Sequence, residues 1–241
     1  MVNRIRELID QSSRIVVLGG ENMVKDNGLN GVRQEDRAYD IEMKYGYSPE
    51  EIVTTAFLMR RVELFYQYYK EEVLDLDHMY PGRGYQAIGK LQKRGKLSAV
   101  ITNTVYGLYQ MAGVQNVVEL HGNVHDNRCP QCGKIYSAEY IKNSIGVPLC
   151  GQCRIVLKPG FSMYGDNMDN GKVSRAAEYA SQADLLLVAG AALDSCLPRW
   201  LLKYYQGDRL ILVNHKEGHC DYQANHTLYG RCDEVLTQII P

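Results

Sequence analysis

The chain has 241 residues, of which 45% are apolar and 23% charged, and its formal net charge is −1. This composition predicts a packed globule and excludes a disordered chain, while the near-neutral charge argues against nucleic-acid binding and against attraction to an anionic membrane. The sequence has no uninterrupted apolar run of about 18 residues and no secretion signal at its start, so we expect a cytoplasmic protein.

Four short apolar runs, in chain order, predict buried strands of a parallel sheet. They lie at 15–18, 99–102, 184–189 and 209–214. A helical pattern over 4–11 precedes the first run, and further helical patterns at 49–74, 85–94, 173–182 and 198–205 supply the crossovers that parallel strands require. The sequence therefore predicts an α/β fold with a Rossmann-like, doubly wound parallel sheet.

Two cysteine pairs interrupt this pattern. They are Cys129 with Cys132 and Cys150 with Cys153, and seventeen residues separate the pairs. Such pairs bind one zinc ion through four thiolates, which leaves no open coordination position and makes the metal structural. Incidental buried pairs, a redox pair and a zinc ribbon that binds nucleic acid are the alternatives. The last is disfavoured because the basic side chains of this segment alternate with acidic ones.

These patterns predict a main domain with a small insertion. The segment 125–159 lacks sheet-like periodicity, and its core consists mainly of the metal site. We therefore expect a zinc module at 125–159 inserted into a nucleotide-binding domain formed by 1–124 and 160–241.

The strand ends carry small and polar residues. In an open parallel sheet, ligands bind beyond the carboxyl ends of the strands, where Gly20, 102–106, Gly190 and Asn214 lie. Glycines there allow a pyrophosphate to approach backbone amides, although an ordinary turn has the same sequence. Nucleotide binding and a plain turn both remain open on these residues alone.

A histidine follows the strand-like segment 116–120. His121 precedes Gly122 and the cysteine module, and an imidazole at a strand end can act as a base near neutral pH. The alternative is a half-buried histidine that packs at the hinge of the module.

Taken in order, these motifs resemble the sirtuins, the NAD-dependent protein lysine deacylases, over almost the whole chain. The most specific part is the Glu-Leu-His-Gly run at 119–122 followed by the four cysteines. Further matches are Gly28, Arg33 and the runs 94–102, 164–166 and 184–190. By this resemblance we identify the chain as a divergent, bacterial-type member.

The resemblance implies a Rossmann-type domain and a zinc module, with NAD between them and an acyl-lysine peptide or protein in the same cleft. His121 matches the family's general base, which acts on a ribose hydroxyl after the acyl oxygen has displaced nicotinamide. The residues that it places on NAD are Gly20, Glu21, Asn22, Arg33, Asn103, Thr104, Tyr106, Gly190, Ala191, Ala192, Asn214 and Cys232. The peptide would pair as an added strand with Ser162, Met163, Tyr164, Gly165 and Asp166.

The chain departs from the family at the cofactor. Glu21 and Asn22 stand in the phosphate turn where the family has Ala and Gly, Thr104 and Tyr106 replace an Asn and an Asp, and Ala191 and Ala192 replace two hydroxyl residues. Two functions therefore remain open. One is an NAD-dependent deacylase of deacetylase type, or an ADP-ribosyltransferase, with an altered pocket; the other is an inactive module that binds a nucleotide, ADP-ribose or an acylated peptide.

Overall fold

The sheet of the computed structural model, which describes residues 1–32 and 34–241, has six parallel strands in the order β3-β2-β1-β6-β7-β8. The strands are β1 (Ile15–Gly19), β2 (Leu97–Thr102), β3 (Val117–Glu119), β6 (Leu185–Ala189), β7 (Leu210–Asn214) and β8 (His226–Tyr229). The chain winds outward from β1 in one direction through β3 and in the other through β8. The strand order thus reverses between β1 and β6, which confirms the predicted doubly wound fold and marks this point as the expected ligand crevice.

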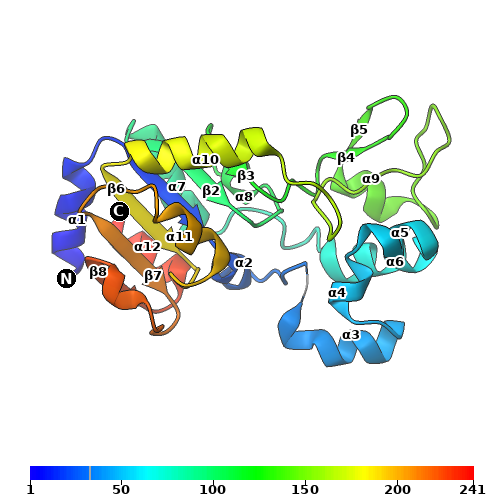
Figure 1. The fold of residues 1–241 in the computed structure, drawn as a ribbon, viewed down its shortest axis with the longest axis horizontal. Helices are drawn as coiled ribbons and strands as arrows, with labels where there is room; N and C mark the ends of the chain where they lie inside the picture. The colour runs from blue at the N-terminus through cyan, green and yellow to red at the C-terminus, as the bar shows by residue number, and fades with distance from the viewer. Residues whose placement is uncertain (33) are drawn as a thin grey trace.

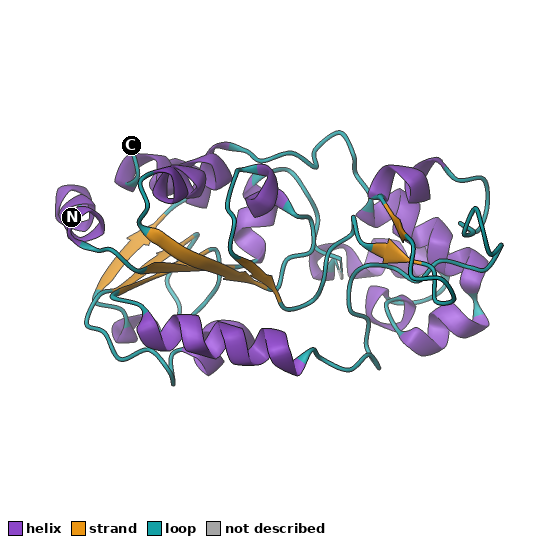
Figure 2. Ribbon diagram, turned by 90° about the horizontal axis from the view of Figure 1, so that it is seen from above, coloured by secondary structure: helices purple, strands orange, loops and turns teal. Residues whose placement is uncertain are grey.

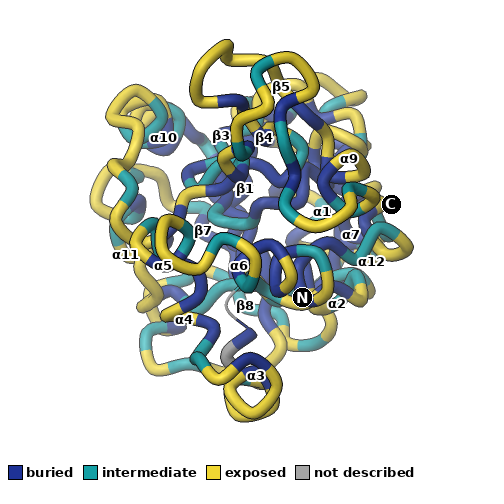
Figure 3. Tube along the Cα trace, turned by 90° about the vertical axis from the view of Figure 1, so that its right-hand side faces the viewer, coloured by how far each residue is buried: buried dark blue, intermediate teal, exposed yellow. Residues whose placement is uncertain are grey.

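Helices cover both faces of the sheet (Figure 2). One face packs against α10 (Asn170–Gln182) and α11 (Cys196–Leu201), and the other against α1 (Val2–Gln11), α7 (Arg83–Lys93) and α12 (Cys232–Ile239). Every residue of β1, β6 and β7 is buried, as Figure 3 shows for the centre of the molecule. These strands are therefore recognisable as continuous apolar runs rather than as alternating patterns.

The sequence pattern did not predict β8. All four of its residues are half-buried or exposed, and it pairs only with β7, so it is an edge strand. A short edge strand with a histidine, a threonine and a tyrosine lacks the apolar run by which the other strands were recognised.

The predicted helix over 49–74 is broken in the structure. It consists of α4 (Pro49–Ile52), α5 (Thr55–Arg60), α6 (Val62–Tyr68) and a π-helical turn η2 (Tyr69–Val73). The Thr54 hydroxyl accepts from the Phe57 N–H and so starts a new helix, and Arg61 leaves helical geometry with ψ of 49°. These helices belong to the β1–β2 crossover, as predicted, but they lie beside the cysteine module, and α7 is the helix of this connection that packs on the sheet (Figure 1).

The cysteine module and the broken helices form a smaller lobe beside the sheet (Figure 1). The lobe contains α3 (Ala38–Tyr45), the two-stranded β4 (Asn127–Arg128) and β5 (Ile135–Tyr136), and α9 (Ala138–Asn143). Two buried tyrosines link its parts: Tyr66 donates to the Leu157 carbonyl and Tyr69 to the Asn127 side chain. The predicted domain boundaries at 125 and 159 stay a prediction.

The remaining short elements connect these layers. They are α2 (Glu21–Asp26), α8 (Leu108–Met111) and the 3-10 turns η1 (Glu35–Arg37) and η3 (Asp221–Gln223). In the part of the chain that the structure describes, no helix has the length and apolar character needed to cross a bilayer.

Candidate functional site

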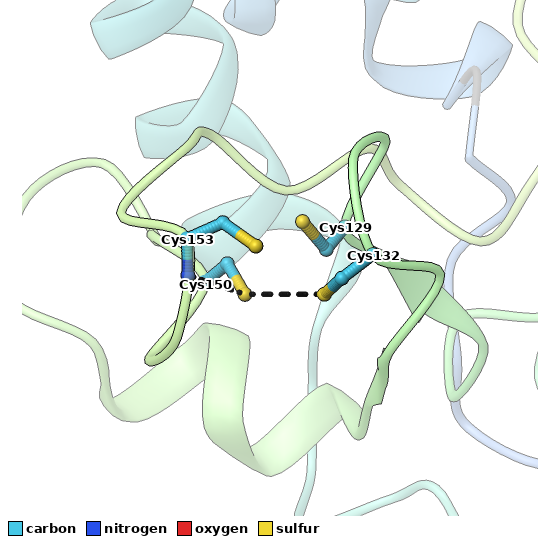
Figure 4. A group of neighbouring side chains, drawn as sticks. All are labelled: Cys129, Cys132, Cys150 and Cys153. Carbon is cyan, nitrogen blue, oxygen red and sulfur yellow. Dashed lines mark hydrogen bonds between the residues drawn. The ribbon is translucent and has the colours of Figure 1, made fainter.

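The four predicted metal ligands converge from two tight turns (Figure 4). The sulfur atoms of Cys129, Cys132, Cys150 and Cys153 lie within 4.8 Å of one another, and the Cys132 and Cys150 Sγ atoms are 3.8 Å apart. Cys129 and Cys150 are buried, while Cys132 is exposed. The donor set and its convergence fit one tetrahedral zinc ion with no open position.

Tyr136 prepares this cluster for a cation. The Gly151 N–H donates to the Tyr136 oxygen at 2.9 Å, which leaves the phenol proton for the Cys150 Sγ atom at 3.1 Å. This hydrogen bond, with backbone donors behind it, lowers the pKa of the Cys150 thiol to about 6. The thiolate form that zinc requires is therefore favoured at this position. The sequence pattern did not identify Tyr136, which is no ligand and has no motif of its own.

A cavity of about 460 Å³ opens at the carboxyl ends of β1, β2 and β3, facing the segment 161–168. It brings together ten predicted site residues, which are Glu21, Asn103, Thr104, Tyr106, His121, Ser162, Met163, Tyr164, Gly165 and Asp166. The candidate base, part of the cofactor set and the whole peptide segment thus line one cavity.

His121 reaches this cavity from a turn that requires glycine next to it. Gly122 has φ of 77°, and a Cβ atom there would lie 2.2 Å from the Gly160 carbonyl oxygen. The His121 carbonyl accepts from the Ser162 N–H at 2.7 Å, so the backbone of the turn is tied to the peptide segment. The backbone of His121 is therefore held in place on both sides, and its side chain lines the cavity.

Asn103 offers an acceptor to a ligand. Its side-chain oxygen is buried in the cavity wall and has no hydrogen-bond partner among residues 1–32 and 34–241. A buried acceptor without a partner costs free energy that a donor on a bound molecule recovers. Thr104 instead bonds to the Thr102 hydroxyl at 2.8 Å.

Tyr106 fills the floor of the cavity. Its side chain is 2% exposed, and its hydroxyl donates to the Asn30 carbonyl in the loop before Arg33. Burial, with Tyr68 and Glu21 nearby, raises the pKa of this phenol, so it stays neutral. The aromatic ring thus ties the floor to the loop at a position where the family has a small acid.

Glu21 begins α2 at the cavity rim. Its carboxylate lies so close to Gly31 that a Cβ atom there would be 3.2 Å from Oε1. The side chain is exposed and lines the cavity, so a negative charge is present where the resemblance expects a diphosphate.

The other cofactor candidates among the described residues lie along the strand ends, outside the lining of this cavity. The Asn22 amide donates to the Asn214 side chain at 2.8 Å, and the Asn22 N–H donates to the Gly190 carbonyl at 3.0 Å. A Cβ atom at Gly20 would lie 2.4 Å from that same carbonyl oxygen, so the two turns require glycine to pack. Ala191 and Ala192 follow as half-buried residues.

Cys232 lies at the start of α12, where its N–H donates to an Asp26 oxygen at 2.6 Å. Burial, together with the Asp26 carboxylate, raises the pKa of the Cys232 thiol to about 12, so the thiol is not a nucleophile at neutral pH. Sequence patterns missed the partners Asp26 and His215 because neither belongs to a spaced motif. Arg33 lies outside the described residues.

The predicted peptide segment is partly paired within the chain. The Tyr164 N–H donates to the Val53 carbonyl at 3.0 Å, and the Tyr164 carbonyl accepts from Thr55 at 2.9 Å. The Met163 N–H donates to the Asp166 carboxylate, which the Lys158 ammonium also contacts at 2.9 Å. The Asp166 N–H also donates to the Met163 carbonyl at 3.0 Å, so 163–166 forms a turn in the lining of the cavity.

The chain resembles known proteins over its full length. Residues 23–196 match the profile of the Sir2 family. An NAD-dependent protein deacetylase of Clostridium acetobutylicum is 30% identical over 99% of this chain and 98% of its own length, and one of Clostridium tetani is 32% identical over 98% and 96%.

Solved structures agree with this assignment. A sirtuin structure determined to explain substrate affinity has a TM-score of 0.86 at 27% identity, covering 100% of this chain and 98% of its own. Sir2Tm bound to a propionylated peptide has a TM-score of 0.80 at 26% identity, covering 99% and 96%. A complex of Sir2 with a p53 peptide and NAD⁺ has a TM-score of 0.79 at 26% identity, covering 99% and 97%. From its sequence, its sheet and its cysteine cluster, the chain belongs to the Sir2 family.

Proposed function

We propose that the chain is an NAD-dependent protein lysine deacylase, of deacetylase type, that carries a structural zinc ion. The observation that carries this proposal is the cavity in which His121, the unpaired Asn103 oxygen and the segment 162–166 meet. Its curated relatives are NAD-dependent protein deacetylases, and its structural neighbours include complexes with acylated peptides and with NAD⁺. Family, cavity and metal site therefore support one activity.

In this proposal NAD lies along the carboxyl ends of the strands. Asn103, Thr104 and Tyr106 would contact its nicotinamide half, because they line the cavity with His121, and Glu21 at the rim would face the diphosphate. Gly20, Asn22, Arg33, Gly190, Ala191, Ala192, Asn214 and Cys232 are proposed for the rest of the dinucleotide. When bound, NAD would supply the electrophilic sugar carbon at which the acyl oxygen displaces nicotinamide.

His121 is proposed as the general base. A neutral imidazole accepts a proton from a sugar hydroxyl near neutral pH, and His121 has the cavity-facing position that this requires. The segment 162–166 is proposed to hold the acyl-lysine peptide. The N–H groups of Ser162, Met163, Tyr164 and Asp166 already donate within the chain, so the incoming strand would pair with the remaining backbone groups of the segment.

Location and domain organisation remain proposals too. All seven cysteines are free thiols, and four of them lie at metal-binding distances, which supports a reducing cytoplasmic compartment. We also propose that 125–159 folds as the metal-dependent module.

The direct test is mass spectrometry of an acetyl-lysine peptide incubated with the zinc-loaded protein and NAD. The proposal predicts loss of the acetyl group and release of nicotinamide in equal amounts, neither of which occurs without NAD. An intact peptide with nicotinamide release and mass added to a protein would support ADP-ribosyl transfer. If neither product forms at high protein concentration, the enzyme assignment is wrong.

A non-catalytic binding function is the second candidate. Two side chains favour it. Glu21 places a carboxylate near the expected position of the diphosphate, and Tyr106, whose hydroxyl donates to the Asn30 carbonyl, fills space expected for the cofactor. Binding of ADP-ribose or an acylated peptide without turnover would select this candidate.

Glu21→Gln should strengthen NAD binding. The substitution removes a carboxylate from the rim while keeping its shape, so a diphosphate would no longer meet a like charge. Because the side chain is exposed and screened by solvent, we expect a modest effect of about 0.2–1 kcal/mol, which corresponds to roughly a 1.5- to 5-fold lower Kd. The measurement is calorimetric titration with NAD at low salt, with Glu63→Gln, an exposed substitution on α6, as the control. A Kd that rises or stays equal would contradict a repulsive role.

A further inference from the structure

Three metal-ligating side chains meet at a second place in the molecule. Asp26 ends α2, His215 follows β7 and Cys232 begins α12. Their ligand atoms lie within 4.8 Å of one another, the same limit that the four-cysteine cluster meets. The His215 Nε2 atom is 3.0 Å from each Asp26 carboxylate oxygen.

The cluster has a buried base and an open side. Cys232 is fully buried and the Asp26 side chain is 5% exposed, whereas the His215 side chain is 35% exposed and gives access from solvent. Behind them, the Tyr85 hydroxyl is buried and has no hydrogen-bond partner in the described part of the chain. This hydroxyl lies within electrostatic reach of both Cys232 and Asp26. The Asp26 carboxylate itself accepts from the Cys232 N–H at 2.6 Å and contacts His215, so it is the buried Tyr85 hydroxyl that indicates a missing polar partner.

The nearest arginine neutralises the Asp26 carboxylate only in part. The Arg231 Nη1 atom is 3.7 Å from the Asp26 carboxylate, and its Nη2 atom donates to the Asp26 backbone carbonyl at 2.9 Å. Its side chain is 51% exposed and is shared with Asp233, which also contacts Arg83 at 3.2 Å. An exposed, shared guanidinium at this distance contributes little and can move away.

We propose that Asp26, His215 and Cys232 form a second binding site, for a divalent transition metal of the zinc type. Oxygen, nitrogen and sulfur donors of this kind are zinc ligands, and three protein ligands leave one coordination position open for water or a small anion. Ligand atoms around a tetrahedral zinc ion lie about 3.3–3.8 Å apart, so on binding the 3.0 Å separation of His215 and Asp26 would widen slightly, while any pair near the 4.8 Å limit would move closer. The metal replaces the thiol proton, which passes to solvent, and the neutral imidazole donates its lone pair.

The test counts metal in the tag-free, full-length protein. After mild chelation and reconstitution with zinc, the wild-type chain should hold a second metal equivalent beyond that of the four-cysteine site, measured by mass spectrometry of the metal. His215→Gln and Cys232→Ser should each lose the second equivalent and keep the first. The matched controls His219→Gln and Cys220→Ser, which alter residues outside the cluster, should keep both. His215 is exposed, so its substitution leaves the fold intact even if Cys232→Ser does not.

Substitution with cobalt tests the Cys232 ligand independently, by absorption spectroscopy. Replacing zinc with Co²⁺ should add a near-ultraviolet thiolate-to-cobalt absorption that Cys232→Ser lowers and Cys220→Ser does not. Arg231→Gln should tighten metal binding by removing a competing positive charge. A single metal equivalent in the wild type, or a second equivalent that survives both His215→Gln and Cys232→Ser, would overturn the proposal.

We also expect a metal ion in the second site to change the affinity for NAD. This expectation rests on the proposed function, in which Cys232 and Asn214 contact the dinucleotide. Filling the second site should then weaken NAD binding several-fold in wild type and leave it unchanged in His215→Gln. Equal affinity with and without the metal would overturn this coupling. If NAD does not bind at all, the proposed function fails, while the metal count still decides the second site.

Discussion

His121→Ala should lower NAD-dependent deacetylation by about 10²–10⁴-fold, the usual contribution of a general base. The effect should fall on the rate and not on binding, because the contact that fixes this turn uses the His121 carbonyl, which alanine retains. Initial rates of peptide deacetylation at saturating NAD, with Kd for NAD measured in parallel, separate these two effects.

The matched control is His219→Ala, an exposed histidine outside the cavity, which should keep full activity. A structural role for His121 would instead lower the melting temperature along with the rate. If His121→Ala keeps activity within about three-fold of wild type, the base assignment is wrong, since even weak general-base catalysis contributes about 10²-fold.

Cys150→Ser should remove the structural zinc and destabilise the smaller lobe. Cys150 is fully buried and accepts from Tyr136, so no neighbouring group can replace its thiolate. The apparent binding free energy of structural zinc, about 10–16 kcal/mol, is free energy of folding, so a variant that loses the ion should lose at least about 3 kcal/mol of stability. For a chain of this size that corresponds to a melting temperature lower by about 6–12 °C.

Two controls separate metal loss from the loss of a buried thiol. Cys220→Ser changes a cysteine outside the four-sulfur cluster and should melt within about 2 °C of wild type. Adding a strong chelator to wild type should reproduce the Cys150→Ser melting curve, and adding it to the variant should change little. Wild-type melting in Cys150→Ser, or in chelated protein, would show that the cluster does not support the fold.

The sequence predicted the centre of the fold because its strands are buried on both faces. Apart from Asn214 at the end of β7, the residues of β1, β6 and β7 are apolar or glycine, a pattern typical of a parallel sheet covered by helices. The polar edge strand β8 has no such pattern. The predicted helix at 49–74 is broken because Thr54 caps a new helix and because the segment packs against the cysteine module. Helical periodicity in the sequence shows neither of these contacts.

The parts of the site that depend on residues close together in the sequence could be predicted. The cysteine quartet follows from local turns, and the cavity position of His121 follows from its place at a strand end beside Gly122. The group of Asp26, His215 and Cys232 joins residues 189 and 206 positions apart, so only the folded sheet brings them together. The closure of the cavity floor by Tyr106 also depends on a contact with the distant loop at Asn30.

The acyl-group preference is constrained by the tyrosines of α6 and η2. By the resemblance to the sirtuins, Tyr66 and Tyr69 correspond to a tyrosine and an arginine of the desuccinylase subgroup. Both tyrosines are buried, and their hydroxyls donate to Leu157 and Asn127. They hold the cysteine module against the helices and do not line the cavity. No acidic acyl group would meet a cation from these two positions, which agrees with the deacetylase-type proposal.

Calorimetric titration of the zinc-loaded protein, first with NAD and then with ADP-ribose, tests the account most directly. The cavity beside His121 and the strand ends from Gly20 to Asn214 predict saturable NAD binding in the micromolar range, weakened by Asn103→Ala, which removes the buried acceptor. If neither NAD nor ADP-ribose at millimolar concentration releases or absorbs heat of binding, the proposed NAD site is wrong, and only the family membership and the fold remain.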